Sequence, residues 1–296
     1  MKKRDILFII VLNAIWGWNF LAVKYSVADF TPFLSNMLRF AVALIFLFPF
    51  LRGSIKGQVG PVLRIAGLMG IMHFGLLYIG MSMAGGVSAI AIVAQLNVPF
   101  ATLCAIFMLK EKIGLTRAFA IVLSFIGVII MGFDPVVFDY VWALVLIGAG
   151  AFAFALASIY MRDLRSVPAM TIQAWVAVAG VIGSLLLTLM FEDHQLANIA
   201  GAGLPAWGGI LFSALLSTVV AHGGMNYLLQ NYEVNVVVPY LLMMPFFAVS
   251  AGVIILGEAL SSRMIIGAVC TLAGVMVITF RNRAKMRRSL IPGEET

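Results

Sequence analysis

The sequence predicts an all-α integral membrane protein of ten transmembrane helices, arranged as two inverted five-helix repeats. Three observations predict this fold: the composition, the lengths of the apolar segments, and an internal repetition of motifs. The 296-residue chain is 63% hydrophobic and 10% charged, with a mean hydropathy of +1.09, whereas a soluble domain carries about 25% charged residues. Most of the chain is therefore expected in lipid, where helices satisfy their own backbone polar groups.

Ten apolar segments are long enough to cross a bilayer as helices, which takes roughly 17 to 25 residues each. The first follows the basic start MKKRD and resembles a signal peptide. It continues past Trp16 without a small-residue cleavage site, so we interpret it as a retained span. The predicted spans are residues 6–27, 33–51, 63–84, 87–109, 116–132, 141–161, 170–190, 207–229, 235–256 and 263–280.

The basic residues predict the orientation of the chain. With the N-terminus placed in the cytoplasm, 16 of the 19 Lys and Arg residues fall on the cytoplasmic side, at the two termini or in connectors. Only Arg263 falls outside, while Lys24 and Arg39 lie in or near spans. This asymmetry agrees with the positive-inside rule. It predicts a multi-pass protein with both termini cytoplasmic and residues 191–205 outside, and it explains the net charge of +7 without a nucleic-acid partner.

The two halves of the chain match at a nearly constant offset. Glu111 and Glu258 stand 147 positions apart, and both are expected to stabilise helix N-termini by their charge. The same offset relates two stripes of small residues, which favour close helix packing: Ala120, Ser124 and Gly127 correspond to Gly267, Thr271 and Gly274. Because each repeat has five spans, the second enters the membrane from the opposite side. The predicted repeats are 1–137 and 138–283, followed by a basic cytoplasmic tail, 284–296.

Two histidines lie within apolar runs at equivalent places in the repeats. The segments GIMHFGLLYIG and VVAHGGMNYLL share one spacing at an offset of 149 positions: His73, Gly75 and Tyr78 correspond to His222, Gly224 and Tyr227. Each histidine either bonds a neighbouring helix or faces a central cavity, where polar residues of spans commonly lie. Asn226 follows His222 by four residues and shares its helix face. The tyrosines are weaker candidates, and the glycines are expected to admit a neighbouring helix.

The first two spans hold three further candidates for substrate binding. Trp16 and Asn19 are three residues apart on one face, where they either bind a small zwitterion or hold helix contacts. Arg39 lies deeper in its span than Lys24. It either pairs with a helix-end carbonyl or polar neighbour, or binds a substrate carboxylate.

Two prolines mark the fourth and ninth spans. Gln95 and Asn97 precede Pro99, and Tyr240 and Met243 precede the matching proline. A proline within a helix bends it and frees a carbonyl. We predict that these four side chains line a substrate path, with plain packing as the alternative for Tyr240 and Met243.

Four motifs in this order resemble the EamA family of the drug/metabolite transporter superfamily: WGWNFLAVK at 16–24, LRF at 38–40, AQLNVPFATLCAIFMLKEKIG at 94–114 and LMMPFFAVSAGVIILGEALS at 242–261. The resemblance covers essentially the whole chain. It implies an inner-membrane carrier that exports amino acids or related small metabolites by alternating access through a central cavity.

Other functions lack the residues that they need. Cys104 and Cys270 have no metal-ligand spacing, and neither metal nor cofactor is expected. No phosphate-binding loop is present, so the sequence predicts no ATP drive within this chain. A membrane-embedded enzyme would gather catalytic groups in one place, and a non-transporting assembly subunit would not need a repeated polar interior. No Asp or Glu lies inside a predicted span. Proton coupling would therefore require His73 or His222, and uniport is the alternative. The expected partners are lipid and an amino-acid-like metabolite, bound by a monomer or weak homo-oligomer.

Overall fold

A computed structural model describes residues 1–111, 113–161, 164, 166–232 and 237–289 of the chain. Within these residues, nine helical segments are long and apolar enough to cross a membrane, and Tyr240–Leu256 is a shorter apolar helical segment. The sequence predicted ten spans, and this shorter segment corresponds to the ninth. The first residues of this predicted span, 235 and 236, lie outside the described residues, and its described part consists of a 3-10 turn, η4 (Val238–Met243), followed by the regular α-helix α15 (Met244–Leu256).

The first half of the chain forms seven α-helices with one π-helical segment between them. In chain order they are α1 (Lys3–Asp29), α2 (Pro32–Leu47), α3 (Val59–Ala66), the π segment η2 (Gly67–His73), α4 (Phe74–Met83), α5 (Ser88–Ala94), α6 (Asn97–Leu109) and α7 (Leu115–Gly132). The 3-10 turn η1 (Phe48–Arg52) follows α2. Helices α3, η2 and α4 together make the third span.

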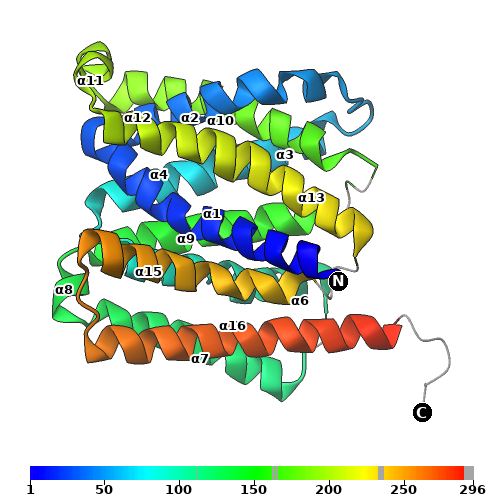
Figure 1. The fold of residues 1–296 in the computed structure, drawn as a ribbon. Coiled ribbons are helices and arrows are strands. Elements are labelled where there is room, and N and C mark those ends of the chain that lie inside the picture. Colours follow the sequence, from blue (N-terminus) through cyan, green and yellow to red (C-terminus); the bar gives the residue numbers. More distant parts are fainter. Residues whose placement is uncertain (112, 162–163, 165, 233–236, 290–296) are drawn as a thin grey trace.

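The second half repeats this arrangement after the short helix α8 (Pro135–Phe138). Its further helices are α9 (Val141–Met161), α10 (Ala169–Phe191), α11 (Gln195–Gly201), α12 (Leu204–Leu211), the π segment η3 (Phe212–Ala221), α13 (His222–Asn231) and α16 (Ser262–Ser289). The start of α1 and the end of α16 lie at one end of the bundle (Figure 1), which we call the terminal end. The far end holds α8 and α11.

Helices α7 and α16 pack side by side through the predicted small residues (Figure 1). Ser124 Oγ donates to Thr271 O at 3.4 Å, and Thr271 Oγ1 donates to Ser124 O at 3.3 Å. A Cβ atom on Gly127 would collide with Thr271, and one on Gly274 would collide with Ser124. The predicted packing role of the stripes is confirmed. We call residues at equivalent positions of the two repeats repeat mates, such as Ser124 and Thr271, or Gly127 and Gly274. The contacts are reciprocal: Gly127 meets Thr271, and its mate Gly274 meets Ser124, the mate of Thr271.

A second contact between equivalent positions joins α2 and α10. Asn36 Nδ2 donates to Ser184 Oγ at 2.8 Å, and these residues stand 148 positions apart in the sequence. The same amide donates to Gly70 O of η2 at 3.2 Å. Phe40 packs where a side chain on Gly180 would lie. The core therefore holds polar pairs at two places where the two halves meet.

Glu258 stabilises a helix of the other half of the chain. Its carboxylate accepts hydrogen bonds from the backbone N–H groups of Val87 at 2.5 Å and Ser88 at 3.1 Å, at the start of α5. The expectation that Glu258 acts at a helix N-terminus is confirmed. The helix is α5 rather than the next one in the chain, a pairing that local sequence cannot reveal. Nearby, Lys24 Nζ donates to Ala84 O, where α4 ends.

The fourth span is interrupted before its proline. Gln95 and Leu96 form a turn between α5 and α6, and Pro99 lies in the first turn of α6. Proline is tolerated at a helix start because the first N–H groups of a helix have no intrahelical partner. The helix therefore ends and restarts here, instead of bending around Pro99 as predicted.

Candidate substrate-binding site

Each half of the chain contains a π-helical segment that leads to one of the repeated histidines. The segment η2 ends at His73, and η3 ends immediately before His222. A π-helix bonds residue i to i+5, is rare, and frequently occurs at functional sites. Sequence reasoning missed both segments, because their apolar composition equals that of an α-helical span.

In η3, side chains reach back five residues to backbone carbonyls. His222 Nδ1 lies 3.0 Å from Ser217 O, and Thr218 Oγ1 donates to Ser213 O at 2.8 Å. Ser217 O also accepts from Trp16 Nε1 of α1, at 3.3 Å. The rings of Trp16 and His222 meet edge to face, with centroids 5.6 Å apart. One backbone carbonyl therefore holds two predicted site residues together.

His73 is held by the neighbouring helix α9. Its Nδ1 lies 2.9 Å from Gly150 O, and its ring packs 5.2 Å from the ring of Phe154. A hydrogen bond to a carbonyl requires a proton on Nδ1, so the neutral ring keeps Nε2 as an acceptor. The same holds for His222. Among the residues that the structure describes, neither Nε2 atom has a hydrogen-bond partner.

Arg39 is the cation at the centre of this region. It is 1% exposed, and its Nε and Nη2 donate to Thr218 Oγ1 at 3.1 and 2.9 Å. Its guanidinium carbon lies 4.1 Å from the ring centroid of Phe74, an attractive cation–π geometry. The Phe74 ring also packs against the His73 ring, with centroids 4.6 Å apart. Thr218 adjoins Ser217, whose O lies 3.0 Å from His222 Nδ1, so contacts of Arg39 lead to both histidines. The predicted pairing of Arg39 with a polar neighbour is confirmed.

Four buried polar atoms of the predicted site residues have no hydrogen-bond partner in the described chain. They are Asn19 Oδ1, Arg39 Nη1, Tyr78 Oη and Gln95 Nε2. A buried polar group without a partner costs about 1–3 kcal/mol. The Tyr78 hydroxyl is a neighbour of the Arg39 guanidinium group, although the two groups do not meet the geometry of a direct hydrogen bond.

The structure brings several predicted residues together. We use the term polar cluster for Trp16, Arg39, His73, Tyr78, Thr218 and His222. Thr218 was missed by sequence reasoning, since a single threonine in an apolar run gives no signal. Tyr240 packs against the same small hydrophobic cluster as Trp16. Asn97 is half-buried at the start of α6, and Met243 is half-buried at the end of η4.

The predicted site residue Tyr227 lies at the surface, away from the polar cluster. The Tyr227 side chain is 40% exposed, and its hydroxyl accepts from Arg4 Nη2 at 3.3 Å at the terminal end. The Asn226 side chain lies outside the described residues. The two glycines also differ. Gly224 lies against Phe8 and Leu12 of α1, whereas Gly75 has only an ordinary contact with Phe33. The expected close helix approach is therefore wrong for Gly75.

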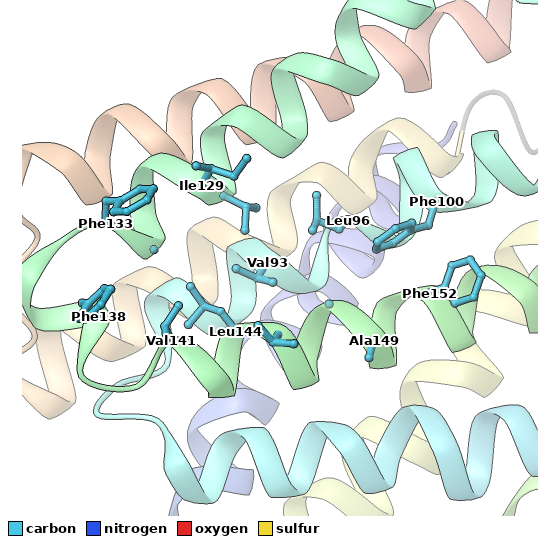
Figure 2. A pocket seen from close by; sticks show the side chains of 14 residues that line it. Val93, Leu96, Phe100, Ile129, Phe133, Phe138, Val141, Leu144, Ala149 and Phe152 are labelled. Carbon is cyan, nitrogen blue, oxygen red and sulfur yellow. The ribbon is translucent and has the colours of Figure 1, made fainter.

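An apolar pocket of about 610 Å³ lies among α5, α6, α7, α8 and α9 (Figure 2). Phe133 and Phe138 lie at one end of it, and Phe100 and Phe152 at the other. Its lining side chains offer no hydrogen-bond donor or acceptor, and none is a predicted site residue. This pocket suits hydrocarbon, whereas the polar cluster suits a polar solute.

The bundle of apolar helices is that of a multi-pass membrane protein, and the family match identifies it as a transporter, not an enzyme. The chain belongs to the EamA-like transporter family of the drug/metabolite transporter superfamily, whose model matches it twice, over residues 3–133 and 141–280. The match therefore shows a duplicated EamA domain.

Relatives of similar length support this assignment. The chain is 24% identical over 300 residues to a protein of Salmonella typhimurium named "Probable amino-acid metabolite efflux pump", covering 96% of this chain and 98% of that protein. It is 28% identical to an "Uncharacterized transporter" of Archaeoglobus fulgidus, covering 94% and 99%. It is also 28% identical to the "Uncharacterized inner membrane transporter YedA" of Escherichia coli K12, covering 84% and 82%. A solved crystal structure shares the fold, with a TM-score of 0.63, 18% identity and coverage of 96% and 99%.

Proposed function

We propose that this protein exports amino acids or related small metabolites across the inner membrane by alternating access. The observation that carries the proposal is the polar cluster, in which two repeat-equivalent histidines and Arg39 gather within the membrane-spanning bundle. Polar groups in membrane spans commonly mark substrate pathways. The names of the Salmonella and Escherichia coli relatives, both "Probable amino-acid metabolite efflux pump", support the substrate class.

The proposed architecture is ten transmembrane helices in two inverted repeats, 1–137 and 138–283, with a tail at 284–296. The reciprocal hydrogen bonds of Ser124 and Thr271 support this architecture, because two residues at equivalent positions of the repeats contact each other only beside the two-fold axis that relates the repeats. Gly127 meets Gly267, while Gly274 meets Ala120. Residue numbers rise on one helix as they fall on the other, so α7 and α16 run antiparallel. A two-fold axis between antiparallel helices lies in the membrane plane. Residues 290–296 of the tail lie outside the described part of the chain.

The proposed orientation places the terminal end in the cytoplasm, because most basic residues are expected there. At this end, Tyr232 Oη donates to Asp5 Oδ2 at 2.5 Å, and this bond raises the pKa of Tyr232. At the far end, Lys24 binds Ala84 O and interacts electrostatically with Glu258. Helix α1 is thus attached to other helices at both ends. Alternating access requires these attachments to loosen in turn, so that the polar cluster opens to one side at a time.

The experiment measures exchange of labelled amino acids by the purified protein in liposomes, with His73→Asn, His222→Asn and His194→Asn as variants. An Asn amide nitrogen takes the place of Nδ1, so it keeps a donor for the carbonyl while it removes Nε2. His194 is exposed in a far-end connector and serves as the matched control. We expect the first two variants to fold and to lose affinity, with His194→Asn unchanged. Equal affinity in all three variants would exclude the histidines from the substrate site.

The same vesicles test the coupling. If a histidine carries a proton, the pH dependence of exchange disappears in the variant that lacks it. If the carrier is a uniporter, the pH dependence is the same in all variants.

A further inference from the structure

Arg39 is a buried cation whose charge no acidic residue of the described chain balances. Within the described part of the chain, Arg39 has no carboxylate partner, and its side chain is 1% exposed. The acidic residues of these ranges lie near helix ends or in connectors. A buried charge is costly unless it is paired. The ring of Phe74, 4.1 Å from the guanidinium carbon, stabilises the cation without neutralising it.

The hydrogen bonds of Arg39 leave one of its nitrogens free. Nε and Nη2 both bind Thr218 Oγ1, whose own proton goes to Ser213 O. This arrangement fixes the plane and direction of the guanidinium group. Nη1 is buried and has no partner among the described residues.

A second free donor approaches Arg39 from another helix. Tyr78 belongs to α4, is fully buried, and its hydroxyl has no hydrogen-bond partner in the described chain. Helices α2 and α4, which carry Arg39 and Tyr78, pack against each other, and the Tyr78 hydroxyl is a neighbour of the guanidinium group. Two free donors, one of them cationic, make a binding site for an anionic oxygen. Charge-assisted hydrogen bonds of this kind are the strong ones in proteins.

We propose that Arg39 Nη1 and Tyr78 Oη together bind the carboxylate of the transported substrate. The carrier then accepts molecules with a free carboxylate and rejects amines and amides of the same shape. This inference rests on the proposed function, because it assigns a substrate group to the same polar cluster. Both atoms are fully buried in this conformation, so the carboxylate binds in a conformation in which α2 and α4 have moved apart.

The histidines complete the description of the ligand. Each has its Nδ1 proton directed to a carbonyl, which leaves Nε2 as an acceptor for an N–H group. An α-amino acid offers both a carboxylate for Arg39 and an ammonium for such an acceptor. An acid without the amino group keeps the first interaction only.

The first experiment compares three amino acids, L-threonine, L-phenylalanine and L-glutamine, with their C-terminal amides. Exchange in liposomes and the melting temperature of the purified protein are both measured. We expect at least one free acid to be exchanged and to raise the melting temperature. Its amide should act at least about tenfold more weakly, which corresponds to the loss of a charged hydrogen bond. An amide as effective as its acid would overturn the carboxylate site while leaving amino-acid transport intact.

The second experiment uses Tyr78→Phe, which removes a hydroxyl without a protein partner and should therefore fold normally. We expect its half-saturating concentration for the acid to rise about 10- to 100-fold, with the response to the amide unchanged. Arg39→Gln should lose the preference for the acid, and Arg64→Gln is its control, because Arg64 stacks on Tyr160, which is not a residue of the polar cluster. Unchanged affinity in Tyr78→Phe overturns the proposal.

The two readouts separate this inference from the function on which it rests. One possible outcome is that an acid stabilises the protein, that Tyr78→Phe abolishes this stabilisation, and that no solute is exchanged. In that case the carboxylate site stands and the transport function fails. If no acid is exchanged or stabilises the protein, both fail.

Discussion

Replacing Gly127 by alanine should destabilise the protein through the contact of α7 with α16. An added Cβ would lie within 2.5 Å of Thr271 N and also too close to the backbone oxygen of Gly267. Backbone atoms cannot rotate away, so the two helices must separate. Overpacking of this kind costs about 1–3 kcal/mol. Separation also weakens the two hydrogen bonds between Ser124 and Thr271, each worth about 0.5–1.5 kcal/mol. The expected total is about 2–5 kcal/mol.

The assay is thermal unfolding of the purified protein in detergent. A loss of 2 kcal/mol lowers the melting temperature by at least about 4 °C, on the scale of soluble domains of 150–250 residues. Gly132→Ala on the same helix is the matched control, because its Cβ would meet only Val141 at an ordinary 3.8 Å. Gly274→Ala should resemble Gly127→Ala, since its added Cβ would collide with Ser124 and with the backbone oxygen of Ala120 in the same way. Equal melting temperatures for Gly127→Ala and Gly132→Ala would refute the reasoning.

Three further changes test the other contacts. Thr218→Val should cost about 1–3 kcal/mol, because Arg39 loses its acceptor, whereas Thr218→Ser should keep most of the stability; thermal unfolding compares them. Glu258→Gln should raise the hydrogen exchange of the α5 amides by weakening a charge-assisted cap, and no rise above an Asp193→Asn control would contradict this. Asn198→Cys, in a background without native cysteines, should react with an impermeant reagent only from outside; labelling from the cytoplasm alone would exclude the proposed orientation.

The sequence was a good guide to helices and a poor guide to their irregularities. Apolar length predicts spans because lipid demands closed backbone hydrogen bonding, and small residues at equivalent positions predicted the contact of α7 with α16. It could not predict η2 and η3, since a π-helical turn has the composition of an α-helical one. The partner of Glu258 was equally hidden, because Ser88 of α5 lies 170 positions away in the sequence.

The candidate site was predicted as residue types and assembled only by the fold. Trp16 and His222 were singled out for different reasons, and the structure joins them on Ser217 O. Tyr78 and Tyr227 share one spacing in the sequence, yet one is fully buried and the other lies exposed beside Arg4. The sequence pattern alone predicts the same environment for two tyrosines at equivalent positions of the repeats. Their neighbours, which come from distant helices, make them different.

The π segments also make the direction of each histidine tolerant of one change in the length of the chain before it. A π-helical turn contains one residue more than an α-helical turn, so it can arise from a single insertion and disappear by a single deletion. In a regular α-helix, removing one residue turns everything after it by about 100° around the helix axis. In η2 or η3 the same deletion closes the π turn to an α turn, and the residues beyond it keep their direction. In relatives of this protein, a one-residue gap aligned to Gly67–His73 or Phe212–Ala221 is therefore compatible with an unchanged binding site, whereas a gap elsewhere in these two spans is not.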